Sequence, residues 1–179
     1  MANYYNNIKR ALYLLFILQL PITLVGQENN TSFNSDSLLS AAREMMAAAK
    51  YCTLITLDTT GSPSARTMDP FAPDENMVIW LGTNGNSKKV KEINRDARVT
   101  LFYQAANGVG YVLIKGHAFL VDDPQKKQTY WKKEWERFYA GQKEAYTLIK
   151  VVPDRLEIID YSKGIFGDPK TWAAPFVEF

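Results

Sequence analysis

The sequence predicts a mainly β protein, an antiparallel barrel with a few inserted helices (α+β), and three observations carry this prediction. Short apolar runs follow one another closely between residues 51 and 161. Turn-forming residues, such as those at 58–63, separate these runs. The sequence shows too few helical segments to connect each strand to the next by a helix, as a parallel βαβ sheet would require.

The first half of the domain is expected to begin with a helix and to continue with three strands. Apolar side chains recur at helical spacing after Asn34-Ser35-Asp36, which predicts a helix that ends near Lys50. Strands are expected at 51–57, 64–71 and 77–81. Residues 82–86 are predicted to form a turn, followed by Ser87 as the N-cap of a short helix over 88–94.

The second half is expected to hold two hairpins with a helix between them. The first hairpin pairs 99–104 with 111–121. Asp122 and Asp123 before Pro124 are typical of a helix start, and the helix is expected to run to about Tyr139. Its aromatic stripe is interpreted as a packing face and consists of Trp131, Trp135 and Phe138. The last hairpin is predicted from 146–152 and 155–161, around Pro153-Asp154.

The N-terminal segment is typical of a secretory signal peptide. Lys9-Arg10 precede an apolar stretch, Ala11–Leu20, that is short for a membrane span. We expect a signal peptide over 1–26, a flexible polar linker over 27–36 and one domain over 37–179. The mature protein would then be exported, periplasmic or secreted, without a stable membrane span. An uncleaved N-terminal anchor is the alternative.

Composition argues against several classes of function. The chain has 21 basic and 19 acidic residues, and removal of Lys9 and Arg10 leaves 19 of each, so a nucleic-acid partner is not expected. Cys52 is the single cysteine, which excludes a disulfide framework, and we expect it to be a buried thiol in a strand. His117 is the single histidine, which argues against a multi-histidine metal site.

The start of the helix at 88–94 is the first candidate site. A helix N-terminus carries partial positive charge and favours acidic residues, but here the first turn holds Lys88 and Lys89 and the first acid is Glu92. A phosphate bound by the helix-end N–H groups, the Ser87 hydroxyl and the two ammonium groups would remove this conflict. A solvated basic helix start is the alternative from this segment alone.

A second group of polar side chains lies on the strand before it. Arg66 is suited to a forked contact with phosphate, and Thr67 and Thr83 would offer hydroxyl groups at strand ends. Asp69 could accept a hydrogen bond or simply cap a turn. If the strands at 64–71 and 77–81 are hairpin partners, Arg66 would meet the helix start.

These motifs together resemble the pyridoxamine 5′-phosphate oxidase-like superfamily, in particular the general stress protein 26 group. The resemblance extends from about Asp36 to the C-terminus and includes the sequence Gly167-Asp-Pro-Lys-Thr-Trp172. It implies an FMN-binding split β-barrel, usually a homodimer with FMN at the subunit interface. By the same resemblance, FMN would contact Arg66, Thr67, Met68, Asp69, Gly82, Thr83, Ser87, Lys88 and Lys89.

The chain departs from the oxidase where that enzyme binds its substrate. Phe71 stands where the oxidase has a lysine for the substrate phosphate, and the tyrosine–arginine–serine and C-terminal arginine–leucine–histidine motifs are absent. Lys88 replaces an arginine, and Tyr111 stands where a glutamine usually meets the flavin ring. Oxidation of pyridoxamine phosphate is therefore not expected.

The expected function is that of a flavin-dependent oxidoreductase that acts on an unknown small molecule. The flavin would carry the redox chemistry, so no catalytic side chain is assigned. A non-catalytic ligand-binding or stress-response module that holds flavin, haem or a similar flat ligand is the alternative, and deazaflavin is a third option for the ligand.

Overall fold

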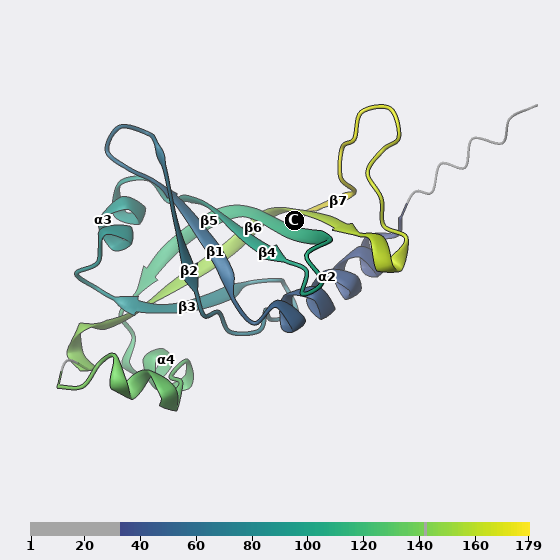
Figure 1. Ribbon diagram of the computed structural model, residues 1–179. Coiled ribbons are helices and arrows are strands. Elements are labelled where there is room, and N and C mark those ends of the chain that lie inside the picture. The colour runs from purple at the N-terminus through teal and green to yellow at the C-terminus, as the bar shows by residue number, and fades with distance from the viewer. Residues whose placement is uncertain (1–32, 142) are drawn as a thin grey trace, which may run out of the picture. The chain divides into compact units, whose positions relative to one another are not determined.

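The computed structural model describes residues 33–141 and 143–179, which form one compact unit. The signal peptide and most of the linker expected before this unit lie outside the described residues. Figure 1 shows the elements, which follow the chain in this order: α2 Ser35–Ala49, β1 Cys52–Leu57, β2 Pro63–Met68, β3 Ile79–Asn84, α3 Lys88–Arg95, β4 Arg98–Gln104, β5 Gly110–Val121, α4 Pro124–Thr129, the 3₁₀ helices η1 Lys133–Arg137 and η2 Lys143–Ala145, β6 Tyr146–Asp160, the 3₁₀ helix η3 Tyr161–Lys163, and β7 Phe176–Glu178.

The strands of the described chain form one antiparallel sheet of seven strands, which confirms the predicted fold class. The order is β2-β1-β4-β5-β6-β3, and β7 pairs with β6. An isolated bridge between Pro70 and Leu81 joins the chain just after β2 to β3, so the two ends of the sheet meet. This contact closes the sheet toward a barrel and brings the C-terminal end of β2 beside β3 (Figure 1).

Helix α2 supplies much of the core. The Asn34 side chain accepts a hydrogen bond from the Asp36 N–H and caps the helix, which begins at Ser35, inside the segment for which we expected a linker. The helix buries Leu38, Ala41, Ala42, Met45 and Met46 in the main hydrophobic cluster with the sheet. Cys52 at the start of β1 is buried in the same cluster, as predicted.

The predicted final hairpin is wrong, because residues 146–160 form one continuous strand, β6. The register between β5 and β6 shifts after Lys115, which pairs with Arg155, whereas Gly116 pairs with Pro153. Asp154 is therefore the extra residue of a β-bulge, and its carboxylate lies 2.8 Å from His117 Nδ1. Pro153 and Asp154 bend the strand here instead of reversing it.

The helix predicted from Pro124 to about Tyr139 starts as expected but is much shorter. Asp123 caps α4 by accepting a hydrogen bond from the Lys126 N–H, and the helix ends at Thr129. The chain then folds into η1, because its aromatic side chains pack against several neighbours rather than along one helix face. Trp135 is buried, whereas Phe138 is 67% exposed, so the predicted stripe is not one packing face.

Strand β3 is displaced along the sequence from its predicted position. It covers Ile79–Asn84, and its pairing with β6 continues to Asn84 opposite Tyr146. Gly82 and Thr83 are therefore strand residues rather than turn residues, while β2 ends at Met68, before the predicted Phe71. No helix among the described residues is long and apolar enough to span a membrane.

Candidate functional site

A cavity of about 410 Å³ lies where β2 ends, β3 ends and α3 begins. Seven of the nine residues predicted to bind FMN line it, and Arg66 and Lys88 are the two that do not. The complete lining is Thr67, Met68, Asp69, Gly82, Thr83, Asn84, Ser87, Lys89, Trp135, Phe138 and Tyr139.

The predicted residues converge by a different route from the one expected. Strand β2 pairs with β1, and β3 pairs with β6, so these two strands are not hairpin partners. The bridge between Pro70 and Leu81 instead brings the end of β2 to β3, and the short turn after Asn84 places α3 at the end of β3. The barrel closure therefore assembles the cavity.

One wall of the cavity carries an ammonium group and two hydroxyl groups. Lys89 Nζ donates to Thr83 Oγ1 at 3.1 Å, and Ser87 Oγ lies 3.4 Å from the same Thr83 oxygen. Ser87 occupies the N-cap position of α3, as predicted, but its side chain makes no capping hydrogen bond. Its hydroxyl therefore remains in the cavity wall, where a bound anion can use it.

The environment of Lys89 disfavours its charged form. Burial lowers the pKa of Lys89 below its ordinary value, and the nearby Arg66 charge lowers it further, while Glu92 acts in the opposite direction. An anion in the cavity would offset both unfavourable effects. This is the local electrostatic property expected of a phosphate-binding lysine.

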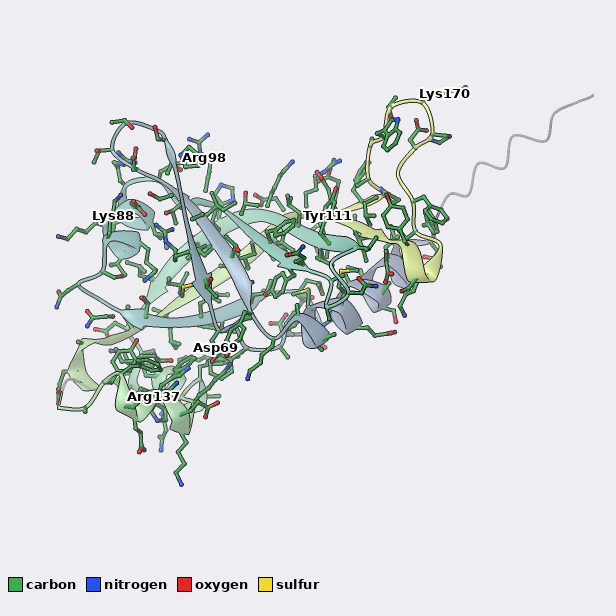
Figure 2. The ribbon with its side chains drawn as sticks, viewed as in Figure 1. Asp69, Lys88, Arg98, Tyr111, Arg137 and Lys170 are labelled. Carbon is green, nitrogen blue, oxygen red and sulfur yellow. The ribbon has the colours of Figure 1, made fainter. Side chains whose placement is uncertain are left out.

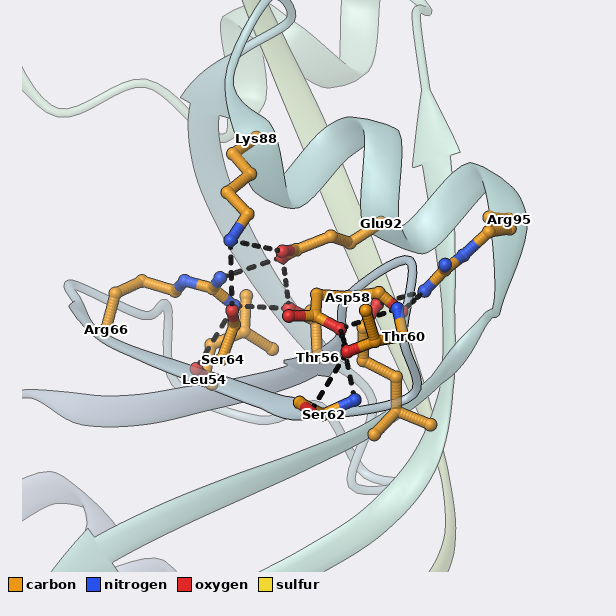
Figure 3. Close-up of polar contacts among 11 residues, drawn as sticks. Leu54, Thr56, Asp58, Thr60, Ser62, Ser64, Arg66, Lys88, Glu92 and Arg95 are labelled. Atoms are coloured by element: carbon orange, nitrogen blue, oxygen red, sulfur yellow. Dashed lines mark hydrogen bonds and ion pairs between the residues drawn. The ribbon is translucent and has the colours of Figure 1, made fainter.

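Arg66 and Lys88 converge on Glu92, which sequence reasoning did not include in the site (Figure 3). Arg66 Nη2 donates to Glu92 Oε2 at 2.8 Å, and Arg66 Nη1 donates to Thr56 Oγ1 at 2.5 Å. The Thr56 hydroxyl in turn donates to Glu92 Oε2 at 2.5 Å. On the other side, Lys88 Nζ lies 3.4 Å from Glu92 Oε1 and 3.4 Å from Ser64 Oγ.

The contacts of Glu92 show that the basic start of α3 does not by itself require a bound anion. The Lys88 charge is paired one helical turn later, so the unfavourable first turn has a compensation within the chain. Burial of Glu92 would raise its pKa, but hydrogen bonds from Thr56 and Arg66, together with the Arg66 charge and Lys88, leave the pKa below its ordinary value. The four-residue spacing of Lys88 and Glu92 was the signal that could have revealed this pair.

Asp69, labelled in Figure 2, follows β2 and holds another part of the cavity lining in place. Its carboxylate accepts hydrogen bonds from Lys132 Nζ at 2.6 Å and from Trp135 Nε1 at 3.0 Å. The Trp135 ring packs over Gly82, where a Cβ atom would overlap it and would lie 2.7 Å from the Tyr146 ring. Gly82 is thus required by the close approach of two aromatic rings.

Three aromatic residues of the cavity were not predicted to belong to it: Trp135, Phe138 and Tyr139. The helical spacing of Trp135 and Phe138 suggested packing alone, and only the tertiary fold places them in the same cavity as Lys89. Trp80 on β3 does not line the cavity and stacks on Tyr130 with ring centroids 4.5 Å apart. Tyr111 stacks on Phe102 and does not line the cavity.

Solved structures of known proteins share this fold. General Stress Protein 26 from Bacillus anthracis str. Sterne is 22% identical, with a TM-score of 0.64, over 79% of this chain and 98% of that protein. A pyridoxamine 5′-phosphate oxidase-related, FMN-binding protein from Nostoc punctiforme PCC 73102 is 14% identical, with a TM-score of 0.56, over 80% of this chain and 95% of that protein. These similarities define the fold as the split β-barrel of FMN-binding proteins.

The sequence places the chain within a family. The model of the family described as "Pyridoxamine 5′-phosphate oxidase like" matches residues 39–167. The chain therefore belongs to the pyridoxamine 5′-phosphate oxidase-like family, as its motifs had indicated. No curated protein matches the chain in sequence.

Proposed function

We propose that the chain is an exported, homodimeric FMN-binding protein that acts as a flavin-dependent oxidoreductase on a small molecule other than pyridoxamine phosphate. One observation carries the proposal: the cavity at the start of α3 is lined by a half-buried lysine, by hydroxyl groups and by aromatic rings. The FMN-binding description of the protein from Nostoc punctiforme supports the same ligand.

The charges around the cavity suit a flavin phosphate. Lys89, Ser87 and Thr83 would contact the phosphate, while Arg66 and Lys88 would act from outside the cavity wall, where Glu92 holds them. Three cations and one carboxylate leave two positive charges, and a phosphate monoester carries about −1.5 to −2 at neutral pH. Binding would therefore nearly neutralise the group.

The remaining lining residues would orient the flavin and exclude water. Thr67, Met68 and Gly82 would lie along it, and the wall anchored by Asp69 would cover it with the Trp135 ring. When bound, FMN would supply the redox chemistry by accepting a hydride and passing electrons to a second acceptor. The chain itself would bind, orient and shield.

Two features argue against pyridoxamine phosphate as the substrate. Phe71, which stands in place of the oxidase lysine, packs edge-on against the rings of Tyr130 and Trp135. The neighbouring cation, Lys132, is already paired with Asp69 at 2.6 Å. These two positions therefore offer no unpaired cation to the substrate phosphate.

The test is a titration of the purified mature chain with FMN and, in parallel, with riboflavin, monitored by flavin fluorescence and visible absorbance. We expect FMN to bind and riboflavin to bind at least tenfold more weakly, because riboflavin lacks the phosphate. Absence of FMN binding would refute the proposal. Reduction of the bound FMN by NAD(P)H and turnover with an acceptor would separate an oxidoreductase from a non-catalytic binding module.

A further inference from the structure

A second and larger cavity, of about 550 Å³, adjoins the candidate flavin site, and Asp69 lines both. It lies between α2, the chain that follows β2, and the start of η1. Half of its twelve lining residues are apolar: Met46, Ala47, Pro70, Phe71, Ala72 and Pro73. The volume lies within the range of pockets that bind small organic molecules.

The cavity lining includes a buried tyrosine whose hydroxyl group has no strong acceptor. Tyr103 on β4 is 1% exposed, and no oxygen or nitrogen atom of the described residues accepts a hydrogen bond from its hydroxyl. Burial raises the pKa of Tyr103, and the charge and hydrogen bond of the neighbouring Cys52 thiol raise it further, so the phenol is neutral at physiological pH and can donate a proton. A thiol is a weak acceptor, so a carboxylate oxygen in the cavity would be a stronger partner for this hydroxyl.

The charged residues around this cavity leave a positive excess. Lys132 is neutralised by Asp69, whereas the Arg43 guanidinium donates only to backbone carbonyls, those of Pro73 at 3.2 Å and Glu75 at 3.0 Å. Lys50 has no carboxylate partner in the described part of the chain, and its ammonium lies 5.3 Å from the ring centroid of Tyr51.

Counted over the whole lining, three cations face two carboxylates, those of Asp69 and Glu134. An apolar cavity with one uncompensated positive charge and a proton donor suits a flat molecule that carries one anionic oxygen group. Phe71 and Met46 would contact its ring, and Lys50 and the Tyr103 hydroxyl would attract its oxygens.

We propose that this cavity binds a small aromatic carboxylate next to the proposed flavin site. The binding step stands on the cavity alone. The position of this compound beside a flavin rests on the proposed flavin function, because it requires FMN in the neighbouring cavity.

The test uses 2-naphthoate as the probe and the mature, flavin-free chain, with calorimetry and ligand-observed NMR as the measurements. We expect saturable binding with a dissociation constant below about 1 mM, and at least tenfold weaker binding of the uncharged 2-naphthalenemethanol. No saturable binding, or equal affinity for both probes, would overturn the proposal.

Three variants locate the probe. Ala47→Phe fills the cavity from the exposed face of α2 and should abolish binding. Tyr103→Phe removes only the hydroxyl and should weaken binding about fivefold. Lys50→Gln should weaken it several-fold, whereas Lys115→Gln, a matched change on β5 outside the cavity, should not alter it. Unchanged affinity in Ala47→Phe would place the probe elsewhere and refute the site.

The FMN titration separates this proposal from the one before it. Ala47→Phe should retain the FMN affinity of the wild type, which also shows that the variant is folded. If the wild type binds 2-naphthoate but not FMN, the ligand site stands and the flavin function fails. If it binds FMN but not 2-naphthoate, the flavin function stands and the ligand site fails.

Discussion

Glu92 connects the cations of the candidate phosphate site to the sheet. It is 5% exposed and receives hydrogen bonds from Arg66 and Thr56, which lie on two different strands. Because the carboxylate is buried, its ionised form depends on these partners, and the partners depend on it for their orientation. The electrostatics of the cavity therefore cannot be separated from the packing of α3 on the sheet.

Replacement of this carboxylate by an amide should destabilise the protein in a pH-dependent way. We expect Glu92→Gln to lower the free energy of unfolding by about 1–3 kcal/mol at pH 7, because Arg66 and Lys88 lose their anionic partner. The pKa of Glu92 is lowered in the folded state, so its contribution is present above the unfolded pKa, near 4.5, and is lost as the pH falls through the folded pKa. Urea unfolding at neutral and acidic pH measures both effects.

The control for this experiment is Glu44→Gln, which removes an exposed carboxylate that pairs with Lys163. Its effect should stay within about 0.5 kcal/mol at every pH. A gap between wild type and Glu92→Gln that stays constant down to acidic pH would contradict the assigned role of the Glu92 charge.

Lys88 and Lys89 are adjacent in sequence but should differ in their effect on FMN binding. Lys89 lines the cavity, whereas the side chain of Lys88 is 70% exposed and pairs with Glu92. We expect Lys89→Gln to weaken FMN binding about 10–100-fold and Lys88→Gln to have a smaller effect, because a charge-assisted hydrogen bond contributes about 1.5–3 kcal/mol. Flavin fluorescence titrations measure both constants, and Lys91→Gln, an exposed change on the same helix, is the control. An equal loss of FMN affinity in the two variants would show that Lys89 has no closer contact with the phosphate than Lys88.

At the scale of elements, local patterns predicted the start of each helix better than the course of the last strands. The caps at Asn34 and Asp123 act within a few residues; Asp123 lies where the sequence indicated, and Asn34 lies within two residues of the predicted helix start. Pro153-Asp154 looked like a hairpin turn, but the pairing of β6 with both β5 and β3 keeps the strand continuous. This pairing joins residues that are far apart in the chain, so local turn preferences cannot predict it.

The candidate site could likewise be predicted where it depends on local sequence signals, but not where it depends on contacts between distant segments. Ser87, Lys88 and Lys89 stand at a helix start that the sequence marks clearly. Residue chemistry also indicated Arg66, Thr67, Asp69 and Thr83, and the family resemblance added Met68 and Gly82. The pairing of Arg66 with Glu92 and the Trp135 wall depend on barrel closure, so they could be identified only from the structure.

The packing of η1 on β3 makes Gly82 a sensitive position. In Gly82→Ala the added methyl group would overlap the Trp135 ring, so we expect the free energy of unfolding to fall by about 1–3 kcal/mol and the near-ultraviolet circular dichroism of the tryptophans to change. Gly85→Ala is the matched control, because its Cβ would have no neighbour closer than 3.5 Å. If thermal unfolding showed the same stability for Gly82→Ala and Gly85→Ala, the contact between Gly82 and the Trp135 ring would be excluded.

At the scale of the whole molecule, the C-terminal segment exposes several large apolar side chains: Tyr161, Phe166, Trp172 and Phe176. Figure 1 shows this segment as a loop that projects from the sheet before β7. The loop is held by Asp168, whose side chain accepts hydrogen bonds from the Lys170 and Thr171 backbone N–H groups and from the Thr171 hydroxyl. A loop braced in this way can present an aromatic residue to a partner.

Trp172 is the residue whose exposure best supports the proposed homodimer, and a variant tests it. It is 82% exposed, and burial of such a ring in an interface is favourable, so we expect Trp172→Ser to weaken dimerisation at least tenfold. Asp168→Ala should weaken it less, because the loop loses its brace but keeps the ring. Sedimentation equilibrium measures the dissociation constants. The control is Phe119→Ser, which removes another exposed aromatic side chain, near the C-terminal end of β5. A wild-type chain that sediments as a monomer at every concentration would refute the homodimer, and an unchanged constant in Trp172→Ser would exclude this loop from the interface.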